Sequence, residues 1–262
     1  MRSNLIQALR AAAVLALSLC SPLAGAQAPL LSVDYETGTP DSGVAELTLS
    51  NASAADAEFV TADLRRYPSR FAIGHKVVLD DPAYVSDGAP RSEAASNRAA
   101  NGTYRPGDHR RYTVSVLLKD WEDWNQVSAP LDIIWQFKHV SGGPDFSIGV
   151  KRNALVLRYG ASGQVTLIDD IRPYDNRWID LRMDVLWSRT SDGYFTADVR
   201  LDGETDYVRK ADLRGLATFD PRFAGEFGYL KWGLYRADSR SANGDARIRV
   251  AYHDDIAAIA LP

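Results

Sequence analysis

The chain has 262 residues, and its 30 Lys and Arg residues against 34 Asp and Glu residues give a formal charge of −4. A chain of this size can bury a full hydrophobic core as one domain of ~200–250 residues, and its negative charge disfavours nucleic acid as a partner. Its one cysteine, Cys20, excludes a disulfide framework. We therefore expect a single domain that is stabilised by its core.

The N-terminal segment is predicted to be a secretory signal peptide. Two arginines precede an apolar run over residues 11–19, and Ala24-Gly25-Ala26 supplies the small residues of a cleavage site. We place cleavage after Ala26, so that residues 1–26 form the signal peptide and residues 27–262 the mature domain. The apolar run is too short for a permanent membrane anchor. We expect a secreted or periplasmic protein with no membrane anchor.

Short strands separated by turns dominate the mature chain. Period-two alternation bounded by Gly, Pro, Asn and Asp clusters predicts strands at residues 45–49, 75–79, 112–118, 132–138, 146–150, 154–159 and 246–252. The clearest alternation runs over residues 178–188 and pairs with residues 194–202 through the turn at Asp192-Gly193. Helical periodicity is scarce. We predict an all-β, single-domain jelly roll, a concanavalin-like sandwich with a concave substrate groove.

Residues 94–111 are rich in Asn, Gly, Ala and Arg, have no apolar period and are predicted to form a long mobile loop. This segment carries five basic residues, Arg98, Arg105, His109, Arg110 and Arg111. A solvated loop is the favoured interpretation, and a basic lid over an anionic chain is the alternative. Nearby, Trp121 and Trp124 are candidates for stacking on sugar rings, although large aromatic residues more often cap a hairpin.

Two further segments place polar groups on one face of a predicted strand. Strict alternation over D-I-I-W-Q-F-K-H predicts a core face of Ile133, Trp135 and Phe137 and an outer face of Ile134, Gln136 and Lys138. His139 falls on the core side unless the strand end turns it round. In Arg91-Ser92-Glu93, the arginine is suited to two-point binding of a carboxylate while Glu93 fixes its orientation.

The segment from Tyr229 to Arg236, Y-L-K-W-G-L-Y-R, has two chemically different faces. Alternation places Tyr229, Lys231, Gly233 and Tyr235 on one face, and Leu230, Trp232 and Leu234 on the other. Two phenols and an ammonium on an exposed face, with a glycine that we expect to leave open space between them, suit proton transfer on a flat polymer.

Together, R-S-E, W-Q-F-K-H and Y-L-K-W-G-L-Y-R make the chain resemble the jelly-roll polysaccharide lyases. It is most similar to the group of heparin lyase I and glucuronan lyase, and more distantly to jelly-roll alginate lyases with R-x-E, Q-x-H and Y-x-K-x-G-x-Y. The resemblance covers nearly all of the mature chain. It implies β-elimination in a uronic-acid polymer, an anionic polysaccharide, with unsaturated oligosaccharides as the product.

The resemblance also implies roles for single residues. Tyr235 would be the catalytic phenol, Lys231 its cationic neighbour, and Gln136 and Arg91 the groups that neutralise the substrate carboxylate. Lys138 stands where the alginate lyases carry histidine, which leaves His139 and His75 as alternatives for a second proton-transfer group. Substrate contacts are expected from Tyr229, Lys138, Glu93 and Arg236.

The resemblance implies no cofactor for the chemistry, but it suggests a structural calcium ion at Glu36 and Asp254. We expect a monomer. Two other functions stay open: a carbohydrate-binding protein without catalysis, because the same sandwich can hold sugars without cleaving them, and a glycoside hydrolase, which requires two carboxylates across the scissile bond.

Overall fold

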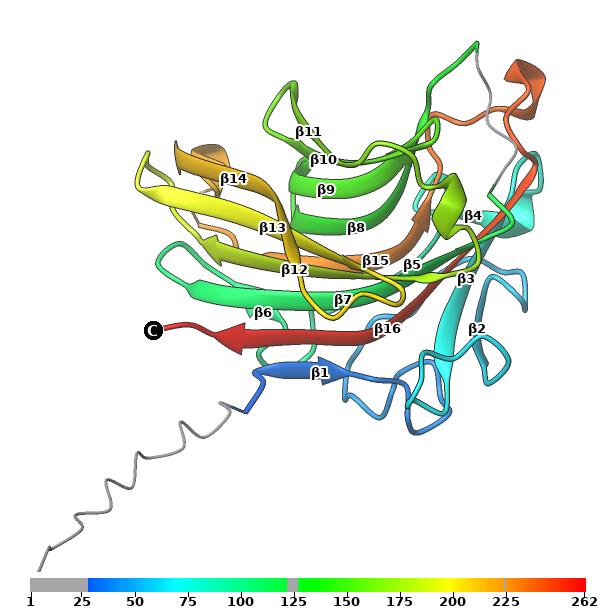
Figure 1. Ribbon diagram of the computed structural model, residues 1–262, viewed down its shortest axis with the longest axis horizontal. Helices are drawn as coiled ribbons and strands as arrows, with labels where there is room; N and C mark the ends of the chain where they lie inside the picture. The colour runs from blue at the N-terminus through cyan, green and yellow to red at the C-terminus, as the bar shows by residue number, and fades with distance from the viewer. Residues whose placement is uncertain (1–27, 122–126, 224) are drawn as a thin grey trace, which may run out of the picture.

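The protein is a sandwich of two antiparallel sheets (Figure 1), described by a computed structural model over residues 28–121, 127–223 and 225–262. Among these residues only short 3-10 helices occur besides the strands. The antiparallel two-layer arrangement confirms the predicted all-β jelly roll. The expected signal peptide and Trp124 lie outside the described residues.

Sheet A has the strand order β14-β13-β12-β7-β16-β3-β2, with β1 beside β16. In that order, its strands are Val208–Leu216, Gly193–Leu201, Trp178–Leu186, His109–Lys119, Ile248–Ala260, Ala72–Val78 and Glu58–Thr61, and β1 is Leu31–Val33. Sheet B has the order β11-β10-β9-β8-β15-β5-β4, with β6 beside β15. Its strands are Gly163–Ile168, Ala154–Tyr159, Pro144–Lys151, Leu131–His139, Gly228–Tyr235, Ala89–Ala95 and Val85–Ser86, and β6 is Thr103–Tyr104.

Four single-turn 3-10 helices connect the strands: η1 (Pro82–Tyr84), η2 (Arg172–Tyr174), η3 (Pro221–Phe223) and η4 (Ser241–Asn243). Among the described residues, no helix is long and apolar enough to cross a membrane.

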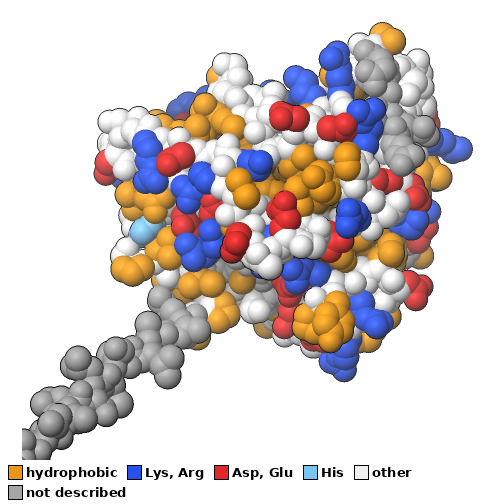
Figure 2. All heavy atoms as spheres, viewed as in Figure 1, with side chains coloured by type: hydrophobic (Ala, Val, Ile, Leu, Met, Phe, Trp, Pro, Cys, Tyr) orange, Lys and Arg blue, Asp and Glu red, His pale blue; other side chains and the backbone are white. Residues whose placement is uncertain are grey.

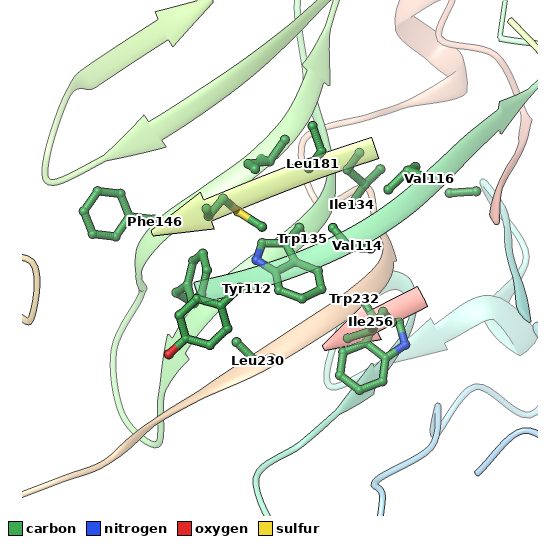
Figure 3. Packing of buried hydrophobic residues seen from close by; sticks show 14 of the residues in the cluster. Tyr112, Val114, Val116, Ile134, Trp135, Phe146, Leu181, Leu230, Trp232 and Ile256 are labelled. Atoms are coloured by element: carbon green, nitrogen blue, oxygen red, sulfur yellow. The ribbon is translucent and has the colours of Figure 1, made fainter. Parts of the chain in front are cut away.

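Alternation in the sequence determines which side chains enter the core. On β12, Ile179, Leu181 and Met183 are each at most 1% exposed, while the residues between them point outward and form ion pairs. Between the sheets, Trp135 stacks on Trp232, with ring centroids 6.3 Å apart. Figure 3 shows residues from β7, β8, β12, β15 and β16 packed in this layer. The core therefore fixes which face of each sheet is turned outward.

The region predicted as a mobile loop is largely structured, so that prediction is wrong. Residues 94–95 end β5, residues 103–104 form β6, and β7 begins at His109. Arg111 bonds Asp184 on the outer face of sheet A, at 2.7 Å, and Arg110 bonds Asp108 and the carbonyl oxygen of Thr103. Basic residues 109–111 therefore belong to sheet A and form no lid over sheet B.

Two smaller expectations also fail. Residues 45–49 form no strand beyond an isolated bridge between Thr48 and Ala95. Trp121 is only 1% exposed and donates a hydrogen bond from its indole nitrogen to the Val250 carbonyl oxygen, at 2.7 Å. A buried indole is not available to stack on a sugar, so Trp121 is a core residue.

Candidate active site

Strand β15 lies near the middle of sheet B, between β8 and β5, and carries both faces expected from its sequence. Leu230, Trp232 and Leu234 are at most 1% exposed and pack in the core. The Trp232 indole donates a hydrogen bond to the Tyr35 hydroxyl, at 2.7 Å, which anchors the strand from below. Tyr229, Lys231 and Tyr235 are therefore turned to the outer face of sheet B.

A charged cluster forms on this outer face where β5, β15 and β8 lie side by side. Glu93 is its centre: one carboxylate oxygen lies 2.8 Å from the Lys231 ammonium and 3.7 Å from the Arg91 guanidinium. The other oxygen accepts a hydrogen bond from the Gln136 side-chain amide. We call these four residues the Glu93 cluster. The structure thus brings together R-S-E, W-Q-F-K-H and Y-L-K-W-G-L-Y-R.

The Glu93 cluster is recessed even though it faces outward. Glu93, Gln136 and Lys231 are only 6%, 3% and 8% exposed. Low exposure on an outward face means that the surrounding side chains rise above these groups and lower their access to water. Electrostatic interactions in such a site are stronger than in bulk solvent.

The two phenols flank the cluster and differ in their neighbours. Tyr235 pairs with Arg91 across the β15–β5 ladder, and the Arg91 guanidinium carbon lies 4.1 Å from the centroid of the Tyr235 ring. Tyr229 pairs with Lys138 on β8. Burial, followed by the negative charges of Glu93 and Asp87, raises the pKa of Tyr229, so this phenol stays protonated near neutral pH.

Lys138 adds a further cation to this face. Its ammonium donates hydrogen bonds to the carbonyl oxygens of His139, at 2.9 Å, and Gly142. Burial, and then the positive charges of Lys231 and Arg91, lower its pKa. Near Lys138, Lys231 and Arg91 lie three carboxylates, Glu93, Asp87 and Glu226, so this part of the outer face carries charges of both signs.

The nearest cation to the Tyr235 ring differs from the expected one. Lys231, predicted as the cationic neighbour of this phenol, forms its ion pair with Glu93, and Arg91 lies over the ring instead. The Arg91 Nε is buried without a hydrogen-bond partner among the described residues. The terminal nitrogens of the Arg91 guanidinium lie near the carboxylates of Glu93 and Asp87, at 3.7 and 3.8 Å.

Gly233 does not leave open space, so that expectation is wrong. Its φ of +137° lies in a region that other residues rarely adopt, and a Cβ built there would overlap the Ser92 carbonyl oxygen and lie 2.7 Å from the Glu93 Cα. The glycine instead lets β5 approach β15 closely enough to bring Glu93 beside Lys231.

Neither candidate histidine lies on the outer face. His75 is 0% exposed, its Nδ1 lies 3.2 Å from the Ser92 hydroxyl, and burial, with the nearby charge of His253, lowers its pKa well below the usual value. His139 is also 0% exposed, with its Nε2 2.8 Å from Asp145 and its ring against Phe219. Strict alternation predicts that His139 lies on the core side, and the structure agrees.

Arg236 does not face the substrate side. It is 1% exposed and forms a buried ion pair with Asp132, at 3.1 Å, whose carboxylate also accepts a hydrogen bond from Ser239. The expectation that Arg236 contacts substrate is therefore wrong. A buried arginine whose partner is a carboxylate stabilises the strand end.

The predicted faces of β8 are correct at one end only. Trp135 and Phe137 are buried in the core, and Gln136 and Lys138 belong to the outer face, as expected. A register shift near Ile133 and Ile134 puts Ile134 into the core and leaves Ile133 partly exposed. A β-bulge reverses the alternation in this way, and strict period two cannot foresee it.

The expected calcium ligands do not assemble a complete site. Glu36 binds Arg70 through its side chain, at 2.9 Å, and no group of three or more His, Asp or Glu residues with the geometry to hold a metal ion occurs in the described part of the chain. Asp254 is buried, and burial followed by the charge of Asp255 raises its pKa to about 7. Calcium at Glu36 and Asp254 remains a prediction, on which no step below depends.

Comparisons with known proteins agree with this architecture. The family model described as polysaccharide lyase matches residues 37–257. No curated protein matches the sequence.

Among solved structures, an endo-β-1,4-glucuronan lyase from Trichoderma reesei is 18% identical with a TM-score of 0.62, over 89% of this chain and 96% of that chain. An alginate lyase from Aplysia kurodai is 11% identical with a TM-score of 0.53, over 89% and 100% of the two chains. A glycoside hydrolase family 131 catalytic domain from Coprinopsis cinerea is 8% identical with a TM-score of 0.60, over 89% and 95%. At these identities the similarity shows the fold.

Proposed function

The chain belongs to the polysaccharide lyase family, and from this premise we propose that it cleaves a uronic-acid-containing anionic polysaccharide by β-elimination, with Tyr235 as the proton-transfer group. The observation that carries this proposal is the Glu93 cluster beside Tyr235 on the outer face of sheet B. The product would be an oligosaccharide with an unsaturated end. The substrate and the use of elimination are inferences from the chemistry of these residues.

Elimination begins with loss of the proton alpha to the uronate carboxylate, which leaves an enolate-like charge. Donors near that carboxylate lower the barrier because they interact most strongly with the developing charge. The Arg91 guanidinium lies over the Tyr235 ring, and the Gln136 amide has a second N–H beyond the one given to Glu93. We assign the neutralisation of the carboxylate to these two residues.

We assign the removal of this proton to Tyr235. A free phenol has a pKa of ~10, so a base near neutral pH needs cationic surroundings. Arg91, whose guanidinium lies over the ring, supplies them. With both candidate histidines on the core side, one phenol would act first as base and then as acid towards the leaving oxygen.

Lys231 and Glu93 would maintain the site. Glu93 binds Lys231 directly and holds the Gln136 amide, so the cation and the amide are kept close to the position of the substrate carboxylate. Such fixed dipoles and charges need little reorganisation during the reaction.

A glycoside hydrolase is the second function to weigh, because one solved hydrolase shares the fold. Hydrolysis requires two available carboxylates. The described strands of sheet B contain three carboxylates: Asp132 is bound to Arg236, Asp145 contacts His139, and Glu93 is held by Lys231. The strand carboxylates therefore favour elimination, and a hydrolase would have to use Asp87 or Glu226 from the flanking loops.

The test is a panel of uronate polymers, including glucuronan, mannuronate and guluronate polymers, incubated with the purified protein. We expect ultraviolet absorbance from C4–C5 unsaturated ends on at least one polymer. New reducing ends without that absorbance would indicate hydrolysis instead. Binding without any product would indicate a carbohydrate-binding protein.

The secreted or periplasmic location, the lack of a membrane anchor and the monomeric state belong to the same proposal. They are supported by the signal-like N-terminal sequence and by a polymeric substrate, which is more accessible outside the cell. Fractionation of the native host and light scattering of the purified mature chain test them.

A further inference from the structure

A row of polar side chains crosses sheet B from the Glu93 cluster to the opposite edge. Residues directly opposite each other on successive strands are Lys231 and Gln136, Gln136 and Ser147, Ser147 and Arg158, and Arg158 and Gln164. Directly paired residues of neighbouring strands point to the same face of a sheet. The row therefore runs over β15, β8, β9, β10 and β11 on the outer face that carries Tyr235.

Arg158 is the cation at the far end of this row. It is exposed, and the described part of the chain gives it no hydrogen bond or ion pair. Its flanking partners in the row, Ser147 and Gln164, offer a hydroxyl and an amide, and neither brings a negative charge. By contrast, Arg200 on the outer face of sheet A is bound by Asp180 at 2.6 Å.

The spacing of the row suits a polysaccharide. Neighbouring strands lie about 4.8 Å apart, so the three strand intervals from Lys231 to Arg158 span roughly 14 Å. A pyranose ring is about as long as one strand interval. A chain that crosses the strands would place one sugar over each strand and its fourth sugar over Arg158.

We propose that Arg158, with Ser147 and Gln164, forms a distal subsite that binds the carboxylate of a uronate about three sugars from the cleaved linkage. This inference rests on the proposed function for the identity of the polymer. An arginine guanidinium can bind a carboxylate through two parallel N–H groups, which fixes both the charge and the orientation of the sugar. The subsite would make longer uronate chains better substrates than short ones.

A binding experiment tests the subsite without relying on turnover. Uronate oligomers of two to eight sugars are titrated by calorimetry into the inactive variant Tyr235→Phe and into the double variant Tyr235→Phe with Arg158→Gln. We expect the arginine substitution to weaken binding of the longer oligomers roughly fivefold to tenfold, as for a partly solvated ion pair. Its effect should shrink steadily as the oligomer is shortened below four sugars.

The matched controls are Arg158→Lys, which keeps the charge but not the two-point geometry, and Arg189→Gln in the turn between β12 and β13 of sheet A. The lysine variant should retain part of the length-dependent affinity, and the Arg189 variant all of it. Equal weakening at every length, or none at any length, would overturn the distal subsite.

Turnover separates this inference from the proposed function. In the otherwise unchanged enzyme, Arg158→Gln should raise KM more than it lowers kcat, and only for chains that reach β10. If the unsubstituted protein forms no unsaturated product on any polymer, the proposed elimination fails, and the binding series still decides whether Arg158 holds a uronate.

Discussion

The outer faces of the two sheets contain similar residues but arrange their charges differently. On sheet A, Asp180 binds both Arg66 and Arg200, and Asp198 binds both Arg182 and Arg209. Figure 2, in the orientation of Figure 1, shows basic and acidic side chains interspersed over the visible face. These cations have carboxylate partners within the protein, so they are already neutralised.

On the strands of sheet B the outward cations outnumber the outward carboxylates, and Asp87 and Glu226 from the flanking loops lie close to Arg91 and Lys138. Arg91, Lys138 and Lys231 share Glu93, and Arg158 lies farther along the same face. Bringing like charges together costs free energy unless an anion arrives from outside. From this difference we propose that the paired charges of sheet A support the fold and that the outer face of sheet B is the one that binds an anionic polymer.

Removing the ammonium at the centre of sheet B should have the largest effect. Lys231→Met deletes the ion pair with Glu93 and one cation of the Glu93 cluster. We expect kcat/KM to fall by about 1000-fold, because electrostatic groups at a developing charge contribute this much. Ultraviolet assay of unsaturated ends measures it. A loss of less than tenfold would assign Lys231 to structure alone.

The corresponding substitution on sheet A, Asp180→Asn, should lower stability without lowering the catalytic rate. Burial raises the pKa of Asp180, but hydrogen bonds from Arg66, Ser115 and Arg200 outweigh it and hold that pKa below its usual value. Asp180→Asn removes the carboxylate that binds Arg200 and leaves Arg66 with Asp255 alone, and it should cost about 3 kcal/mol of unfolding free energy, measured by urea denaturation. Activity per folded molecule should remain. If activity fell while stability held, the contrast between the two faces would be lost.

The same pKa shift sets the pH range of this contribution. A carboxylate with a depressed folded pKa stabilises the protein above its unfolded pKa, and the contribution disappears as pH falls through the lower folded value. The difference in stability between the unsubstituted protein and Asp180→Asn should therefore be complete near neutral pH and shrink in acid.

A change of stability with pH can resemble a change of catalysis with pH. A substitution of Glu58 identifies the part that comes from stability. Burial raises the pKa of Glu58 to about 7. Since the folded state then binds the proton more tightly, stability falls as pH rises from about 4 to 7. Glu58→Gln should gain about 3 kcal/mol at pH 8 and little at pH 4, by denaturation at both values. The same gain at both values would contradict the raised pKa.

The smallest expected effect is that of salt on KM, and it should depend on cations of sheet B only. Polyanion binding to cations weakens as ions screen it, so Lys138→Gln should raise KM severalfold at low salt and hardly at all in ~1 M salt. Lys210→Gln on β14 of sheet A is the control and should change neither value. A similar salt response for both variants would mean that net charge, and not the face, governs binding.

Much of the fold can be predicted from the sequence, because the apolar residues that alternate along each strand are the residues that form the core. Ile179, Leu181 and Met183 alternate with charged residues, and they are the side chains that the sheets bury. The strands within residues 94–111 are not predicted, because alanine and arginine give no clear alternation there. The backbone of this segment nevertheless pairs in both sheets.

The sequence predicts the site residues correctly on regular strands. It does not predict them where a β-bulge or the pairing between strands decides their position. Alternation placed Lys231 and Tyr235 on one face, and the resemblance joined them to Arg91 and Gln136. Alternation also puts Arg236 on the core side of β15, so the expected substrate contact ran against the pattern, and only the structure shows that its partner is Asp132. Arg158 was also missed, since its place in the row depends on pairing across three strands.

The most direct test of the account compares the two phenols of β15 in one assay. Tyr235→Phe and Tyr229→Phe each remove a single hydroxyl from the same strand and face, and both variants are followed by the absorbance of unsaturated ends on the preferred uronate polymer. We expect no detectable product from Tyr235→Phe and measurable turnover from Tyr229→Phe, with unchanged melting temperatures. Full activity in Tyr235→Phe would contradict this expectation.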